Sequence, residues 1–147
     1  MELINENDVV FDLNVSTQKE TLRVLAEMAY KNGNVDDGET FYQELCKREE
    51  ESTTGFGNGI AIPHARHACV KKAGILFVRC AQDIEWNSID GEPVQACVCL
   101  IAPDDKNDFH LKTLSKFARR LIHDEFVDLL KNADKETVLA EINEIIK

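Results

Sequence analysis

Residues 94–102 read Val-Gln-Ala-Cys-Val-Cys-Leu-Ile-Ala, and this stretch decides the fold class. It is far shorter than the roughly 20 apolar residues that a membrane-spanning helix needs, and its length suits a strand. Because apolar residues fall on both alternating sides of the stretch, both faces of the strand have to be covered. The pattern therefore predicts a strand within a sheet that has further structure on each side.

The segments around this strand predict helices on both sides of it in the sequence. Thr17 and Glu20 form a capping box at the start of one helix, and Gly33 ends it. A second helix follows Asp37 and buries apolar residues at helical spacing. We expect strands at 9–13 and 73–80 and three later helices at 109–123, 125–131 and 135–146. Helices before and after a group of strands predict three layers with the sheet in the middle.

In the helix at 109–123, an apolar stripe is predicted to face the core. Its members are Leu111, Leu114, Phe117, Ala118, Leu121 and Ile122.

Length and charge exclude several classes of protein. The 147 residues fit a single domain over 1–147, and 27 acidic against 17 basic side chains give a net charge of −10. Such an acidic chain is unsuited to general nucleic-acid binding or to adsorption on an anionic membrane. The start has no signal-peptide pattern, and the five cysteines form no C-x-x-C pair. We therefore expect a cytoplasmic protein with reduced thiols and no membrane insertion.

The segment with the clearest chemical potential is Gly55-Phe-Gly-Asn-Gly-Ile-Ala-Ile-Pro-His-Ala-Arg66. Its three glycines leave backbone amides free to approach an anion. Ile60 and Ile62 predict a short buried strand that Pro63 ends, so that His64 is held as an exposed imidazole at the strand exit. An imidazole keeps a free nitrogen at neutral pH, as a nucleophile requires. The plainer interpretation is an ordinary polar residue at the end of a strand.

Two other kinds of site can be considered for this segment. No lysine followed by Ser or Thr comes after the glycines, so the loop is not a Walker loop and no nucleotide site is predicted. His64, His67 and Cys69 have residue types that bind zinc, and His110 lies further on. A structural zinc site normally takes four ligands from two close pairs. The other close pair, Cys97-x-Cys99, fits core packing better, so no metal is expected.

Several separate motifs resemble the enzyme IIA domains of the bacterial phosphotransferase system, fructose/mannitol class. The residues Thr54-Gly-x-Gly-x-Gly-Ile-Ala-Ile-Pro-His64 are similar to the active-site signature of that family. Further matches are Cys46-Lys-Arg-Glu49, Ile84-x-Trp86 with Asp90-Gly91, and the helix His110-Leu-Lys-Thr-Leu-Ser-Lys-Phe-Ala-Arg119. The resemblance implies an α+β fold, a three-layer α/β/α sandwich with a central mixed β-sheet flanked by helices.

The resemblance also implies a phosphotransferase function without metal or cofactor. Such domains accept a phosphoryl group from the phosphocarrier HPr on one histidine and pass it to a cysteine of a IIB domain. The IIB domain phosphorylates a sugar that enters through a membrane IIC domain. By this resemblance His64 is the phosphorylated residue, through Nε2, and Arg48 and His110 are its companions. Thr54, Gly57 and Gly59 are further candidates for phosphate binding.

General chemistry agrees with these roles and leaves plainer alternatives open. Arg48 is a permanent cation whose planar fork suits phosphate, and His110 begins a helix, where free amides attract an anion. Arg48 equally suits an exposed ion pair with Glu44 or Glu51. His110 suits core packing in a first helical turn, and the Thr54 hydroxyl suits capping of the loop.

Two alternatives to sugar transport follow from the same sequence. The family includes regulatory proteins of the nitrogen type, which bind kinases or transporters depending on phosphorylation. A phosphoryl group on His64 would then act as a switch that adds negative charge at an interface. A scaffold without chemistry would require the glycine loop to be incidental. The sequence does not distinguish fructose, mannitol and galactitol.

Overall fold

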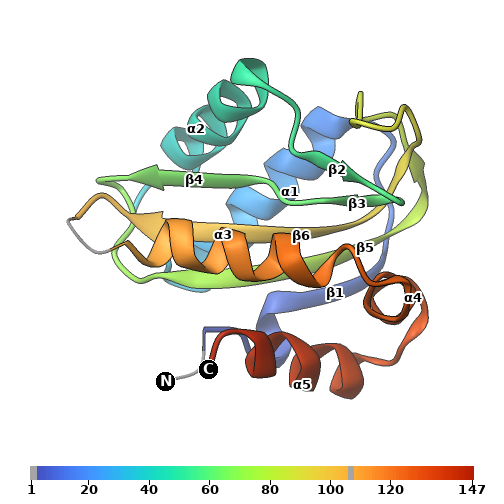
Figure 1. The fold of residues 1–147 in the computed structure, drawn as a ribbon. Coiled ribbons are helices and arrows are strands. Elements are labelled where there is room, and N and C mark those ends of the chain that lie inside the picture. Colours follow the sequence, from blue (N-terminus) through green and yellow to red (C-terminus); the bar gives the residue numbers. More distant parts are fainter. Residues whose placement is uncertain (1–2, 106–107) are drawn as a thin grey trace.

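The computed structural model describes residues 3–105 and 108–147, and a single sheet organises this part of the chain (Figure 1). The strands are β1 (Val9–Leu13), β2 (Gly55–Gly57), β3 (Ile60–Ala61), β4 (His64–His67), β5 (Gly74–Ile84) and β6 (Val94–Pro103). The helices are α1 (Gln18–Lys31), α2 (Gly38–Glu51), α3 (Phe109–Arg120), α4 (Asp124–Asn132) and α5 (Lys135–Ile145), with a 3-10 turn at Glu6–Asp8. Among the described residues, no helix has the length and apolar character to cross a membrane.

Strand β6 lies at the centre of the sheet. The order is β1-β5-β6-β3-β2, and β4 pairs with β6 beyond the end of β3. Strand β5 is antiparallel to β6 and parallel to β1, whereas β3 and β4 are parallel to β6. The sheet is therefore mixed, as expected.

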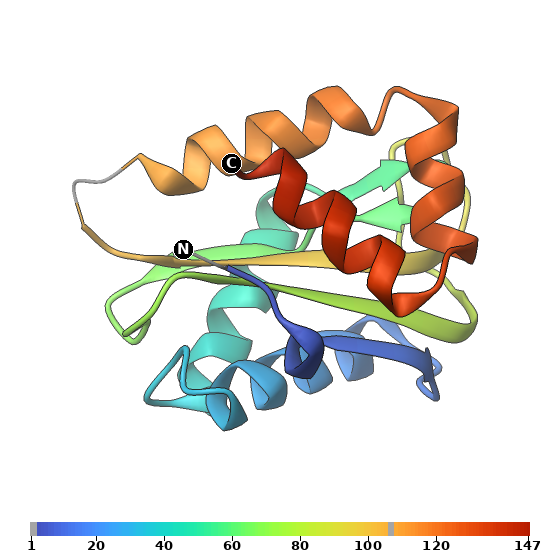
Figure 2. The ribbon, with the colours of Figure 1, turned by 90° about the horizontal axis from the view of Figure 1, so that it is seen from below.

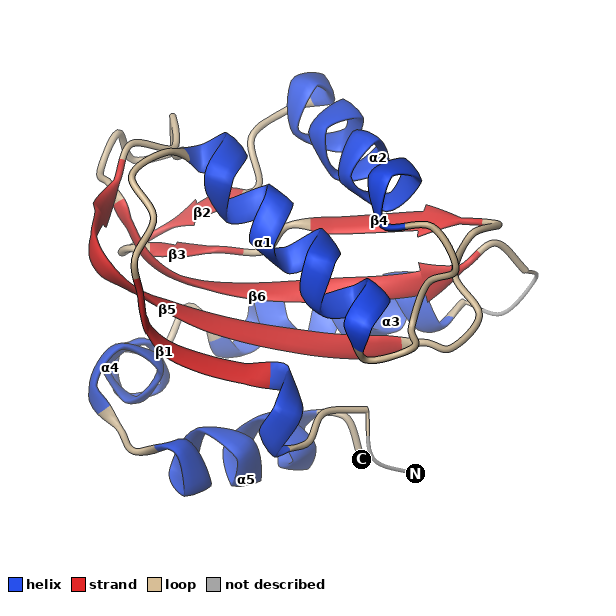
Figure 3. Ribbon diagram, turned by 180° about the vertical axis from the view of Figure 1, so that it is seen from behind, coloured by secondary structure: helices blue, strands red, loops and turns tan. Residues whose placement is uncertain are grey.

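The two faces of β6 are buried against separate cores. Cys97, Cys99 and Ile101 belong to the core beneath α1 and α2. Val98 and Leu100 belong to the core that includes residues of α3, α4 and α5. Figure 2 shows the sheet between these two groups of helices, and Figure 3, seen from the other side, shows α1 and α2 in front of the sheet. The predicted three-layer arrangement is confirmed.

Local signals set the ends of the first two helices as expected. Thr17 accepts a hydrogen bond from the Glu20 amide, and the Glu20 carboxylate accepts one from the Thr17 amide. Past the end of α1, Gly33 has a φ of +81°, a backbone conformation that glycine adopts without strain. Asp37 caps α2 by accepting from the Thr40 amide.

Strand β3 ends at Ala61, before Pro63, as the proline predicts, but the expectation that His64 lies at a strand exit is wrong. Ile60 lies opposite Ala96 in β3, and His64 lies opposite Leu100 in β4, so the register with β6 is unchanged across the proline. Proline lacks an N–H and removes one donor from the ladder, but its carbonyl still accepts from the Leu100 amide at 3.0 Å. His64 therefore begins a further stretch of the sheet edge and does not lie at a strand exit.

The predicted apolar stripe of α3 is only partly correct. Phe117 and Leu121 are buried, but Leu111 is 62% exposed and Ile122 is 71% exposed. Ile122 lies beyond the last helical residue, Arg120. Leu111 lies about 100° around the helix from its neighbour His110 and is turned away from the sheet.

We expect Phe117→Ala to lower the free energy of unfolding by about 3–5 kcal/mol, because it removes a fully buried ring. Leu111→Ala on the same helix should cost less than about 0.5 kcal/mol, because that side chain is largely in water. Urea unfolding of both variants measures the difference. Equal costs would contradict an α3 that turns Phe117 toward the sheet and Leu111 toward solvent.

Candidate active site

His64 lies at the edge of the sheet with its ring almost fully covered. Its residue is 6% exposed, so the expectation of an exposed imidazole is wrong. Arg48 of α2 contacts the ring, and the ring of His110 of α3 lies beside it. A hollow of about 210 Å³ opens beside it. The residues that line this hollow are Glu44, Lys47, Arg48, Glu51, His64, Ala65, Arg66 and His110.

Hydrogen bonds at both ring nitrogens fix the orientation of His64. Nδ1 lies 2.7 Å from the carbonyl oxygen of Ile62, which can only accept, so Nδ1 carries the hydrogen. Nε2 then has a free electron pair, and it accepts from Nε of Arg48 at 3.1 Å. The ring therefore presents Nε2 to the arginine.

Arg48 comes from the last turn of α2, and its guanidinium is held at two points. Besides His64, it donates from Nη1 to the Ser52 carbonyl at 2.8 Å. Within residues 3–105 and 108–147, Arg48 forms no ion pair. The alternative interpretation, an exposed ion pair with Glu44 or Glu51, is therefore wrong. The planar donor group of Arg48 lies where it would meet an anionic group bound to Nε2 of His64.

His110 lies in the first turn of α3, close to His64. The centroids of the two imidazole rings are 5.0 Å apart, and the ring planes are tilted by 52°. Nδ1 of His110 is buried and has no hydrogen-bond partner in the part of the chain that the structure describes. A buried polar atom without a partner is costly, and a ligand in the hollow could satisfy it.

Both imidazoles are neutral at neutral pH. The pKa of His110 is lowered to about 4, mainly by burial and further by the neighbouring His64, Arg66 and Arg48. Burial also lowers the pKa of His64, and the Arg48 charge acts in the same direction, while the hydrogen bond to Ile62 and the nearby Glu49 and Glu51 oppose the shift. A neutral His64 retains the electron pair that a nucleophile needs.

The glycine segment and Thr54 lie apart from this hollow. Asn58 and Gly59 have φ of 57° and 84° and form the tight turn between β2 and β3. Gly57 faces the side chain of Asp90, and the Thr54 hydroxyl donates to Glu49 at 2.5 Å. The glycines therefore shape a hairpin, and the structure brings together only His64, Arg48 and His110 among the predicted site residues.

Sequence reasoning missed Arg66, Lys47 and Glu49. Arg66 lines the hollow and lies 3.7 Å from Asp104. Residues two apart in a strand share a face, so the spacing from His64 was a usable signal for Arg66 once the strand was known to continue. Lys47 lines the hollow beside Arg48, whereas Glu49 reaches Thr54 and Trp86. Both stand in the motif Cys46-Lys-Arg-Glu49, in which the resemblance assigns a role only to Arg48.

The geometry of the described residues does not support the alternative of a metal site. In residues 3–105 and 108–147, no group of three or more His, Cys, Asp and Glu side chains is placed to hold a metal ion. His67 instead accepts a hydrogen bond from the Cys69 amide at 2.9 Å.

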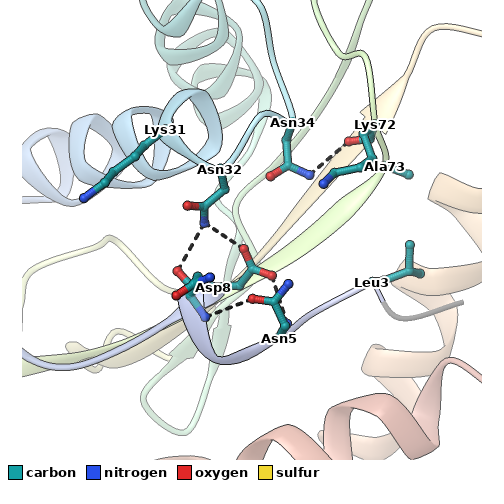
Figure 4. A pocket seen from close by; sticks show the side chains of 9 residues that line it. Leu3, Asn5, Asp8, Lys31, Asn32, Asn34, Lys72 and Ala73 are labelled. Atoms are coloured by element: carbon teal, nitrogen blue, oxygen red, sulfur yellow. Dashed lines mark hydrogen bonds between the residues drawn. The ribbon is translucent and has the colours of Figure 1, made fainter.

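A second hollow, of about 300 Å³, lies between the N-terminal segment and the end of α1 (Figure 4). Asn32 donates there to Asp8 at 2.7 Å and to the Asn7 carbonyl, and Asn34 donates to the Lys72 carbonyl. Asp8 in turn accepts from the Asn5 amide. These bonds join the N-terminal segment, α1 and the chain before β5, which gives the polar lining a structural role.

The fold and the order of its elements are those of phosphotransferase-system IIA proteins. A crystal structure of the nitrogen regulatory protein IIA-Ntr from Neisseria meningitidis superposes with a TM-score of 0.86 at 26% identity, covering 99% of this chain and 97% of that one. The IIA protein in a complex of enzyme IIAMTL with phosphorylated enzyme IIBMTL from Escherichia coli has the same fold. Its TM-score is 0.81 at 18% identity, over 97% of this chain and 98% of that one.

Sequence comparison gives the family. Residues 2–146 match the family described as phosphoenolpyruvate-dependent sugar phosphotransferase system, EIIA 2. The chain is 40% identical over 125 residues to the PTS system fructose-like EIIA component of Escherichia coli (strain K12), which covers 85% of this chain and 84% of that protein. It is 30% identical over 142 residues to a nitrogen regulatory protein of Klebsiella oxytoca, covering 95% and 86%. This chain belongs to the EIIA 2 family of the phosphotransferase system.

The low pKa of His110 has a consequence for stability. Below its ordinary pKa of 6.5, His110 binds a proton in the unfolded chain, but in the folded chain it does so only near pH 4. The free energy of unfolding should therefore fall as the pH drops from about 6.5 toward 4. In His110→Gln this fall should be shallower than in the unaltered chain. Urea unfolding between pH 7 and pH 5 measures the slope, and an equal slope in His110→Gln would contradict the buried, neutral state.

Proposed function

We propose that this chain is a cytoplasmic IIA phosphocarrier of the sugar phosphotransferase system, in which His64 carries the phosphoryl group. The observation that supports this most directly is the fixed ring of His64, whose Nε2 accepts from Arg48 while Nδ1 is held by Ile62. The 40% identity to a fructose-like EIIA component supports a role in sugar uptake.

In the proposed first step, Nε2 of His64 attacks the phosphorus of the phosphohistidine of HPr in line. A new P–N bond forms and the P–N bond of HPr breaks. The HPr imidazole, protonated on its other ring nitrogen, leaves with the electron pair as a neutral ring. Nδ1 of His64 keeps its hydrogen and donates it to the Ile62 carbonyl throughout. Arg48 moves its donors from Nε2 to the phosphoryl oxygens, where they stabilise negative charge.

In the proposed second step, the thiolate of a IIB cysteine attacks the same phosphorus. An S–P bond forms and the P–N bond to His64 breaks, which restores the neutral imidazole. His110 lies close enough to His64 to contact the phosphoryl oxygens in both steps. No step requires a metal or a nucleotide. The IIB partner is supported by the complex that one structural relative forms, and IIB would pass the group to a sugar entering through a membrane IIC domain.

A second candidate function is phosphorylation-dependent regulation. It is favoured by the similarity to nitrogen regulatory proteins in both sequence and structure. In that case phosphorylation of His64 would still occur, but no IIB cysteine would receive the group. Incubating the phosphorylated chain with its cognate IIB domain separates the two functions, because only a transport component transfers the group to the thiol.

The proposal is tested with phosphoenolpyruvate, enzyme I and HPr, followed by intact-mass analysis. The unaltered chain should gain one acid-labile phosphoryl group, and His64→Ala should gain none. His110→Ala should still accept the group in part but transfer it onward poorly, because its contact to the oxygens is lost. His123→Ala, at an exposed position before α4, is the matched control and should behave as the unaltered chain. An adduct on His64→Ala would contradict the assignment.

A further inference from the structure

The side chain of Glu49 joins three segments that meet behind the active site. Oε2 accepts from the Thr54 amide at 2.7 Å and from Nε1 of Trp86 at 3.2 Å, and Oε1 accepts from the Thr54 hydroxyl at 2.5 Å. Trp86 is 1% exposed and Thr54 is also buried. The carboxylate thus connects the last turn of α2 to the chain that enters β2 and to the segment after β5.

Glu49 directly follows Arg48 in α2, and the two side chains contact different parts of the structure. Arg48 reaches His64, whereas Glu49 reaches Thr54 and Trp86. The Ile62 amide donates to the Thr54 carbonyl at 2.9 Å, so Thr54 is also tied to the segment that leads into His64. A short series of contacts therefore fixes the position of the Arg48 guanidinium relative to the His64 imidazole. It runs from Arg48 to its neighbour Glu49, and then through hydrogen bonds to Thr54 and Ile62 and along the chain to His64.

We infer that Glu49 is a positioning residue for phosphoryl transfer, acting through Arg48. This inference rests on the proposed function and extends it, because it assigns a role to a residue that does not line the hollow beside His64. Catalysis of phosphoryl transfer depends mainly on placing charges correctly, and a displacement of about 1 Å can cost about 100-fold in rate. Loss of the Glu49 contacts would free the last turn of α2 and with it Arg48.

Two substitutions separate hydrogen bonding from bulk. Glu49→Ala removes all three acceptor contacts. Glu49→Gln keeps one oxygen for the Thr54 amide and the Trp86 indole, and its amide group can donate to the Thr54 hydroxyl, which accepts as well as it donates. We expect Glu49→Ala to slow phosphoryl uptake from phospho-HPr by about 10- to 100-fold, chiefly in kcat, and Glu49→Gln to recover most of that loss. Glu50→Ala, an exposed neighbour on the same helix, is the matched control.

A double-mutant cycle with Arg48 distinguishes positioning from a general structural role. If Glu49 acts through Arg48, then Arg48→Ala with Glu49→Ala should transfer no more slowly than Arg48→Ala alone. A role independent of Arg48 predicts that the two losses multiply, and that outcome would overturn the inference. Equal rates for Glu49→Ala and the unaltered chain would overturn it too.

Trp86 is the only tryptophan in the sequence, so its indole N–H gives one NMR signal that reports the Glu49 contact directly. This signal should shift in Glu49→Ala and stay close to its original position in Glu49→Gln. If Glu49→Ala does not fold, Thr54→Val, which removes the hydroxyl that donates to Glu49 Oε1, carries the same cycle with Arg48→Ala. If the unaltered chain does not accept the phosphoryl group from phospho-HPr, the proposed function itself is refuted. The same assay, run on the unaltered chain, distinguishes that result from a failure of the Glu49 inference.

Discussion

The structure depends on the requirement that β6 be paired along both edges and covered on both faces. Its residues alternate between two buried cores, so helices have to lie on each side of the sheet. The same strand sets the register of β3 and β4 along one edge, which places His64 opposite Leu100. The position of the active site therefore follows from the pairing of a strand that contains none of its residues.

At that edge, the site is built from groups that restrain one histidine. The Ile62 carbonyl holds Nδ1, the Arg48 guanidinium meets Nε2, and burial keeps both His64 and His110 neutral. A neutral imidazole with one nitrogen occupied has a single nucleophilic atom, and a cation already lies beside it. We therefore interpret the site as prepared for an anionic phosphoryl group before that group arrives. Glu49 extends this arrangement behind the site, where it holds the helix that carries Arg48.

Sequence reasoning predicted those features that depend on local chemistry. The capping box of Thr17 and Glu20, the end of α1 at Gly33 and the doubly apolar β6 are all confirmed. The motifs also singled out Arg48, His64 and His110, which the structure brings together. The return to the sheet at His64 after Pro63 could not be predicted, because it depends on pairing with a strand more distant in the sequence. The burial of His64 and the contacts of Glu49 depend on tertiary packing in the same way, and no local pattern encodes them.

The central claim is that phosphorylation occurs on Nε2 of His64, since Nδ1 is engaged by a carbonyl that cannot donate. Nitrogen-15 NMR of the imidazole rings, recorded before and after phosphorylation with enzyme I and HPr, tests it most directly. The account predicts that the phosphoryl group appears on Nε2 of His64 and that Nδ1 keeps its proton. A phosphoryl group on Nδ1, or on another histidine, would contradict it.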